Sequence, residues 1–232
     1  MKARILCYDR VLSTQDLARE LVTSGVRATM GTVIVATEQQ RGRGRHGRTW
    51  LSPCGGLYAS FILTPDPLLP FLAGVALAQA LGELGLCARL KWPNDVLVAE
   101  RKIAGILIEV IDRCAIVGIG VNIEQAPLPT ATCVWAEARG SITRDTLLRS
   151  ILDNLDSVYA EGILEKYCAL SATIGRKVRI ELATAKDLKV ICGKATGIDR
   201  SGRLLIETDE GSHAITAGEC IHLRFDRDER DG

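Results

Sequence analysis

Hydrophobic and polar residues follow two different periods in the part of the chain before about residue 170. Short apolar and β-branched runs are typical of buried strands, and they occur at 4–8, 31–37, 57–63, 89–92, 96–99, 103–110 and 115–123. Apolar residues at helical spacing occur after Ser13, at 68–84, at 143–160 and just before 170. This part of the chain therefore predicts a sheet with flanking helices.

Two local patterns indicate where elements begin and turn. Ser13 precedes the first helical segment and Asp16 follows three residues later, a capping-box pattern typical of a helix N-terminus. The runs 96–99 and 103–110 are joined only by residues 100–102. Two apolar runs with so short a connection predict a β-hairpin.

The pattern changes from residue 174 onward. Short strands separated by turn residues are predicted at 177–182, 189–196, 203–207, 213–216 and 220–224. Short strands at this close spacing favour a small antiparallel barrel. We therefore predict a main domain at 1–171, a small β-barrel domain at 172–225 and a charged tail at 226–232.

Composition and charge favour a globular protein with a localised anion site. The chain has 232 residues, 47% of them hydrophobic and 25% charged, and 29 basic against 28 acidic residues give a net charge of +1. A dedicated nucleic-acid-binding protein usually has a broad basic excess, so a small anionic ligand is the better prediction. The sequence has no secretory signal pattern and no apolar run that could span a bilayer, which indicates a cytoplasmic protein.

The eight cysteines are scattered along the chain and form no C-x-x-C pair. We interpret them as small buried apolar residues rather than as zinc ligands or a disulfide framework. No cysteine is assigned a chemical role.

Basic residues concentrate in segment 39–50, QQRGRGRHGRTW, where four arginines and His46 alternate with three glycines. Such cations stay solvated, and glycines cost the most entropy to order. We therefore predict a mobile loop that becomes ordered around an anion. Guanidinium groups and free backbone N–H groups suit phosphate. The alternative is a solvated basic loop or an RNA-binding patch.

The three glycines, Gly42, Gly44 and Gly47, also form a literal G-x-G-x-x-G pattern. A dinucleotide site would need a helix to begin there, but Trp50, Pro53 and the glycines that follow cannot begin one. No Gly-Lys-Ser/Thr sequence completes a Walker phosphate loop either. The pattern is therefore not interpreted as a nucleotide-binding fingerprint.

A second polar cluster, KWPND at 91–95, places a cation, an aromatic ring, an amide and a carboxylate around Pro93. The simpler interpretation of this cluster is a turn with an Asx hydrogen bond. Lys102 could reach back toward the end of the preceding strand, or it could be a solvated hairpin lysine. Asn122 ends an apolar run and could bond a purine edge, or it could simply form a turn.

These motifs occur in one order: Ser-Thr-Gln at 13–15, Gln39 before GRGRHGRTW, KWPND, RKIAGILIE, VGIGVNI and the predicted barrel. In this order they closely resemble the biotin protein ligases, enzymes that biotinylate the carrier domains of carboxylases, over nearly the whole chain. The resemblance is to the short class without an N-terminal DNA-binding domain. It implies an α+β fold related to class II aminoacyl-tRNA synthetases: a mixed sheet with flanking helices, followed by an SH3-like β-barrel.

The resemblance also implies a role for each matching residue. Biotin would be bound by Ser13, Thr14, Gln15, Gln39, Arg43, Gly44, Arg45, Lys102 and Gly105. The nucleotide would be bound by Arg43, Arg45, Trp50, Asn94 and Asn122. Lys102 and Arg43 would stabilise the reacting carboxylate and α-phosphate, and Asp95 would lie where the acceptor lysine arrives. No metal ligand is assigned in the protein, because Mg²⁺ would arrive with ATP.

The implied activity activates biotin with ATP to biotinyl-5'-AMP and then transfers biotin to a lysine of a biotin carboxyl carrier domain. No DNA or membrane partner is expected, and the chain would be a monomer or a homodimer. Lipoate ligases and octanoyltransferases share the implied fold and are the nearest alternatives. A non-enzymatic RNA-binding module is an alternative of another class, which the 4% content of aromatic residues disfavours.

Three positions depart from the family's pattern. Gln15 stands where asparagine is usual, His46 stands where arginine is usual, and Cys54 occupies the variable position of the Ser-Pro-x-Gly-Gly turn. None of them removes a residue with an assigned chemical role. The adenine-stacking tryptophan of some members has no certain counterpart, because Trp135 is shifted and could be a core residue.

Overall fold

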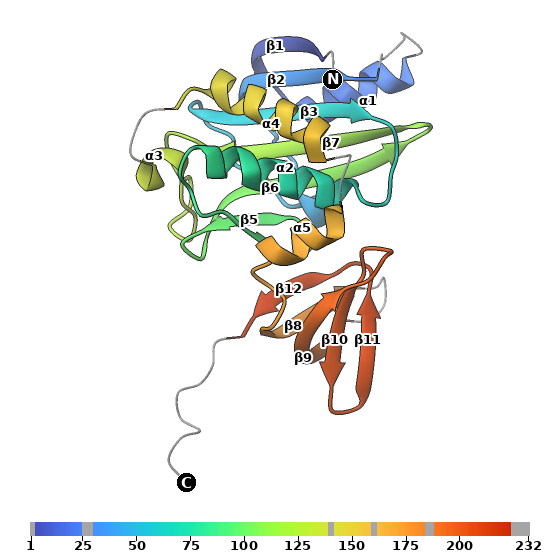
Figure 1. Ribbon diagram of the computed structural model, residues 1–232. Helices are drawn as coiled ribbons and strands as arrows, with labels where there is room; N and C mark the ends of the chain where they lie inside the picture. The colour runs from blue at the N-terminus through green and yellow to red at the C-terminus, as the bar shows by residue number, and fades with distance from the viewer. Residues whose placement is uncertain (1–2, 25–29, 139–141, 159–161, 184–187, 224–232) are drawn as a thin grey trace.

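The computed structural model describes residues 3–24, 30–138, 142–158, 162–183 and 188–223, which contain two β-sheets (Figure 1). The first sheet has seven strands, in the spatial order β1 (Arg4–Val11), β2 (Thr32–Gln39), β3 (Gly56–Leu63), β7 (Cys114–Asn122), β6 (Arg101–Ile111), β5 (Asp95–Val98) and β4 (Arg89–Lys91). Strands β1 and β2 are parallel, and the other neighbouring pairs are antiparallel. The prediction of a mixed sheet is confirmed.

Helices cover both faces of the first sheet. α2 (Leu69–Glu83) and α4 (Arg144–Val158) lie over one face, and α1 (Thr14–Thr23) lies over the other (Figure 1). α5 (Ile163–Leu170) follows α4 and leads toward the second sheet. A short helix that the sequence pattern did not predict, α3 (Val134–Glu137), follows β7.

Residues 33–36 of β2 are apolar without a break, and the packing of their side chains explains why. Val33 and Val35 pack in the larger core together with α2, whereas Ile34 packs on the opposite face with Ala18 of α1. Successive side chains of a strand point to opposite faces. Since both faces of the strand are covered here, the consecutive residues 33–36 are all apolar.

The C-terminal strands form the second sheet, which is antiparallel. Their spatial order is β11 (Gly211–Ile215), β10 (Leu204–Thr208), β9 (Leu188–Ile198), β8 (Lys177–Ala183) and β12 (Glu219–His222). All of the predicted strands are present, but β11 and β12 are not paired with each other in the part of the chain that the structure describes. The sheet is open there, so the predicted closed barrel is not confirmed.

The structure does not test the predicted C-terminal tail or the predicted domain boundary. The tail at 226–232 lies outside the described residues, and the division at residue 171 stays a prediction. Among the helices that are described, none has the length and apolarity needed to cross a membrane.

Candidate active site

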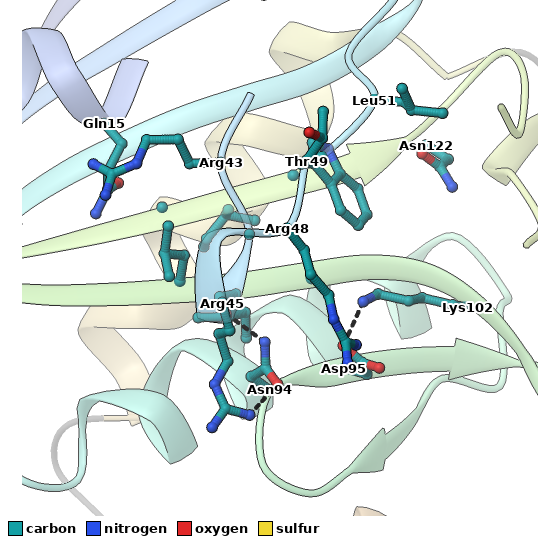
Figure 2. A pocket seen from close by; sticks show the side chains of 18 of the residues that line it. Gln15, Arg43, Arg45, Arg48, Thr49, Leu51, Asn94, Asp95, Lys102 and Asn122 are labelled. Atoms are coloured by element: carbon teal, nitrogen blue, oxygen red, sulfur yellow. Dashed lines mark hydrogen bonds and ion pairs between the residues drawn. The ribbon is translucent and has the colours of Figure 1, made fainter. Parts of the chain in front are cut away.

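One cavity, of about 260 Å³, opens where the Arg/Gly loop at 39–50 folds over β6 and β7. Its lining includes every residue that the resemblance implicated: Ser13, Thr14, Gln15, Gln39, Arg43, Gly44, Arg45, Trp50, Asn94, Asp95, Lys102, Gly105 and Asn122. Figure 2 shows that these side chains come from segments far apart in the sequence. The structure therefore brings all of the predicted site residues together.

The start of α1 supplies a buried polar end of the cavity. Gln39 Oε1 accepts hydrogen bonds from the backbone N and the Oγ1 of Thr14, at 2.8 and 3.1 Å, and Gln39 Nε2 donates to Ser52 Oγ at 2.8 Å. Ser13 caps the helix, because its hydroxyl accepts from the Asp16 N–H at 3.4 Å. These fixed hydroxyls and amides can bind a neutral polar group such as a ureido ring.

Gln15, which departs from the family's pattern, is held firmly in place. It is 3% exposed, its Nε2 donates to Ile116 O at 3.2 Å, and its Oε1 accepts from Ser60 Oγ at 3.0 Å. A Cβ atom on Gly118 would lie only 2.7 Å from Gln15 Oε1. The longer amide therefore fits because the strand below it carries a glycine.

The Arg/Gly loop is a closed hairpin. Arg43 bridges to Thr49, the Gly44 N–H donates to Arg48 O at 2.8 Å, and the Trp50 N–H donates to Gly42 O at 2.9 Å. A single 3-10 turn, η1 (Arg45–Gly47), forms its tip. The loop thus has a defined conformation of its own.

Three of the loop arginines have protein partners, although the Arg48 side chain is still 63% exposed, in line with the prediction of solvated cations. Arg43 donates to Asp16 Oδ1 at 2.9 Å and to both carboxylate oxygens of Glu109, at 2.9 and 3.2 Å. Arg45 donates to Asn94 Oδ1 at 3.2 Å, and Arg48 forms a bidentate ion pair with an acid of the second sheet. These partners are distant in sequence, which is why the local pattern could not reveal them.

The second sheet reaches the cavity through β12. Arg45 donates to Gly218 O at 3.3 Å, and Glu219 is the partner of Arg48. The hydrogen bond from Arg48 lowers the pKa of Glu219, and burial lowers the pKa of Arg45 although Asp95 and Glu219 oppose that shift. Sequence reasoning missed this contribution, because nothing in the spacing of Gly218 and Glu219 distinguishes them from an ordinary strand start.

Lys102 reaches back to the preceding strand, as predicted. Its Nζ lies 2.6 Å from Asp95 Oδ1 and 5.3 Å from the centre of the Trp50 ring (Figure 2). The β5–β6 hairpin places the two residues side by side, because Leu97 pairs with Lys102 and Asp95 pairs with Gly105. The cavity thus contains a fixed ammonium group beside a carboxylate.

The Trp50 indole packs against two glycines of the sheet. A Cβ on Gly105 would lie 3.2 Å from Trp50 Cζ3, and a Cβ on Gly120 would lie 2.4 Å from Trp50 Nε1. The Trp50 Nε1 is buried, and it has no hydrogen-bond partner among the described residues. The indole therefore occupies space that only glycine leaves open.

Both asparagines implicated in nucleotide binding also bond the backbone. Asn94 Nδ2 donates to Ile106 O at 2.8 Å, and Asn122 Nδ2 donates to Thr132 O at 3.1 Å. Their side chains are fixed by these bonds, with Asn94 also accepting from Arg45. Their contact with a nucleotide stays a prediction.

Two interpretations of apolar residues are corrected. Four cysteines, Cys7, Cys54, Cys87 and Cys192, are exposed rather than buried, and all eight are free thiols. Trp135 is not a core residue, because it is 44% exposed and its Nε1 donates to Ile142 O at 3.3 Å. The prediction of burial used residue type alone, because a sequence does not show which surface would cover each side chain.

Comparison with known proteins identifies the family of this chain. A profile of the Biotin/lipoate A/B protein ligase family matches residues 9–123, and a profile of the biotin protein ligase C-terminal domain matches residues 173–223. A relative from Mycobacterium tuberculosis, a biotin–[acetyl-CoA-carboxylase] ligase, is 32% identical over 84% of this chain and 80% of its own length. The chain belongs to the biotin protein ligase family.

Solved structures of this family superpose over most of the chain. The Aquifex aeolicus biotin protein ligase, in complex with biotin and ATP, has a TM-score of 0.79 and 33% identity, and the match covers 97% of this chain and all of that one. The Leishmania major enzyme in complex with biotinyl-5-AMP has a TM-score of 0.68 and 26% identity, covering 94% of this chain and all of that one. The biotin ligase fold is thus established for this family member.

Proposed function

We propose that this chain is an ATP-dependent biotin protein ligase, which makes biotinyl-5'-AMP and transfers biotin to a lysine of a carrier domain. The observation that carries the proposal is the fixed ammonium of Lys102, 2.6 Å from Asp95, in a cavity that is also lined by the part-buried polar pair Thr14 and Gln39. A neutral ring would bind at the polar end, and its carboxylate would then lie beside the ammonium.

In the first step a biotin carboxylate oxygen attacks the α-phosphorus of MgATP, and the bond to pyrophosphate breaks. Two anions must approach each other, so fixed cations accelerate the step by positioning and by electrostatic stabilisation. Lys102 lines the cavity and can supply one of these cations. Arg43 would have to leave Asp16 and Glu109 before it contacts the phosphate.

In the second step the amine of an acceptor lysine attacks the carbonyl carbon of the anhydride, and AMP leaves. The attacking nitrogen must lose a proton, and we propose that Asp95 orients the amine or accepts that proton. The mixed anhydride is sensitive to water, so the hairpin loop would also shield it. No covalent intermediate with the enzyme is needed.

We further propose an acceptor, a metal requirement, a cellular location and a domain organisation, each of which the family resemblance implies. The acceptor is a biotin carboxyl carrier domain, as the name of the Mycobacterium tuberculosis relative suggests. Mg²⁺ enters with ATP, and the protein is cytoplasmic. It binds no DNA, and the net charge of +1 supports this last proposal. The division at residue 171, the closure of the second sheet into an SH3-like barrel and a monomeric or homodimeric state also remain proposals.

The activity is tested by pyrophosphate exchange into ATP. With Mg²⁺ and biotin we expect rapid exchange, and with Mg²⁺ and lipoate we expect none above background. Lipoate ligase is the runner-up because the family profile covers both substrates, but the match of residues 173–223 to the biotin ligase C-terminal domain favours biotin. Exchange driven by lipoate and not by biotin would reverse the assignment.

The glycine beneath Trp50 gives a prediction about ligand binding. Gly120→Ala would place a methyl group 2.4 Å from Trp50 Nε1, so the indole must shift. Overpacking of this kind costs about 1–3 kcal/mol, and we expect biotin affinity measured by calorimetry to fall about tenfold. Gly197→Ala is the matched control, because its nearest neighbour lies 3.9 Å from the new Cβ. Wild-type affinity in Gly120→Ala would contradict this role of the glycine.

A further inference from the structure

The outer edge of the first sheet is covered by the residues that lead into the second sheet. β4 is the last strand of the first sheet, and its free edge would leave backbone groups unpaired. Ser171 forms a parallel bridge with Leu90, the Ala172 N–H donates to Leu90 O at 2.7 Å, and Arg89 Nη2 donates to Ser171 O at 2.7 Å. Residues 171–172 thus extend the sheet beside the KWPND turn.

Thr173 continues this contact into the turn itself. The Trp92 N–H donates to Thr173 Oγ1 at 3.0 Å, and Thr173 is 0% exposed. Since Pro93 has no N–H, this is the last backbone donor before Asn94. Asn94 is also bonded to β6, since the Ile106 N–H donates to Asn94 O at 3.0 Å, but the backbone that leads into the turn is held by a side chain outside it.

Thr173 is itself held from two sides. Its backbone N–H donates to Ser171 Oγ at 3.1 Å, and its Oγ1 lies 3.0 Å from His222 Nε2. His222 is the last residue of β12 and pairs with Val178 of β8. A continuous set of hydrogen bonds therefore joins the second sheet to the backbone of the KWPND turn.

The surroundings of His222 keep this link intact at neutral pH. Burial, together with the positive charges of Lys91 and Arg176, lowers the pKa of His222 to about 4, although Glu100 opposes the shift. A neutral imidazole can either donate to the threonine hydroxyl or accept from it. The ring and the hydroxyl can thus satisfy each other while the hydroxyl accepts from Trp92.

We propose that Thr173, held by His222, is a positioning residue that fixes the turn carrying Asn94 and Asp95 against β6. This deepens the proposed function, on which it rests, by assigning the second sheet a part in it. Thr173 does not line the cavity and touches no substrate; it acts through the Trp92 backbone. Biotin's polar ring would bind at Thr14 and Gln39, where Gln39 bonds to Thr14 and Ser52 rather than to this turn.

The test compares Thr173→Val, which removes only the hydroxyl, with Thr173→Ser, which restores it. We expect Thr173→Val to lower kcat of biotin-dependent pyrophosphate exchange about tenfold and to raise KM for ATP, with the biotin Kd unchanged within twofold. Thr173→Ser should recover most of kcat. Thr196→Val is the matched control, because Thr196 is exposed on β9 and its hydroxyl bonds only within the second sheet, to Leu205 O at 3.4 Å.

A second variant and a second readout keep the proposal testable if Thr173→Val folds poorly. His222→Leu should lower kcat in the same direction, and the double variant should be no worse than Thr173→Val alone, because the two residues act as one unit. Hydrogen exchange of the Trp92 amide should accelerate in His222→Leu as well, and at least tenfold in Thr173→Val, whichever substrate the enzyme uses.

Three outcomes would overturn the proposal: wild-type kcat in Thr173→Val, equal losses in the valine and serine variants, or unchanged exchange of the Trp92 amide. Failure of the proposed function would look different, because the wild-type protein itself would show no exchange with biotin. An active wild type with an equally active Thr173→Val would refute only the positioning role.

Discussion

Lys102→Ala is expected to reduce biotin-dependent ATP–pyrophosphate exchange by about 10²-fold or more, while the protein stays folded. A preorganised group that stabilises developing charge typically contributes about 10²–10³ to kcat. Lys102 is such a group, because its ammonium is fixed beside Asp95 and the Trp50 ring before any substrate arrives. The loss should fall mainly on kcat, because the ammonium stabilises the transition state in which the carboxylate attacks the α-phosphate.

The free energy of unfolding should change little in Lys102→Ala. The Lys102 side chain is 36% exposed, and an ion pair this accessible contributes about 0–1 kcal/mol to the free energy of unfolding. Thermal unfolding and exchange kinetics would be measured on the same preparation. Lys189→Ala, which changes an exposed lysine of β9, is the control for loss of charge. An exchange rate in Lys102→Ala equal to that of the wild type would sink the assignment of Lys102.

The elements of the fold could be predicted from the sequence because their causes are local. Residues 33–36 of β2 are all apolar because both faces of the strand are covered there, and the β5–β6 hairpin follows from two apolar runs with a short connection. The approach of Lys102 to Asp95 follows from that hairpin. A pattern over neighbouring residues is sufficient for each of these conclusions.

The partners of the loop arginines could not be predicted, because their causes are not local. Arg43 pairs with Asp16 and Glu109, and Arg48 pairs with Glu219, across separations that no periodic pattern records. For the same reason the pattern predicted the C-terminal strands correctly, whereas its prediction that they close into a barrel is not confirmed. Closure depends on pairing between the first and last strands of a sheet, and sequence spacing says nothing about that pairing.

These contacts change the interpretation of the Arg/Gly loop. A loop of free cations would be ordered only by an anion, but here the hairpin is tied to α1, to β6, to the KWPND turn and to β12. An arriving phosphate must therefore compete with carboxylates for some of the same guanidinium groups. Arg45 differs from Arg43 and Arg48, because it bonds to a side-chain amide and a backbone carbonyl and has no ion pair with a carboxylate among the described residues.

Arg45→Gly is therefore expected to let biotinyl-adenylate escape before transfer, at least ten times faster than in the wild type. The variant loses both hydrogen bonds that tie the loop tip to Asn94 and Gly218. Hydrogen bonds from a charged donor contribute about 1.5 kcal/mol or more each, and a second glycine after Gly44 makes the closed loop costlier to order. The escaped anhydride would biotinylate any nearby lysine, so diffuse labelling of an added bystander protein is the measurement.

Two comparisons make this result specific to the loop. Arg41→Gly changes an exposed arginine of the same loop that does not line the cavity, so bystander labelling should stay at the wild-type level. Adding Lys102→Ala to Arg45→Gly should abolish the labelling, because no adenylate forms to escape. Bystander labelling at the wild-type level in Arg45→Gly, with the adenylate still tightly retained, would show that the loop does not act as a lid, and its arginines would then serve only to bind the phosphate.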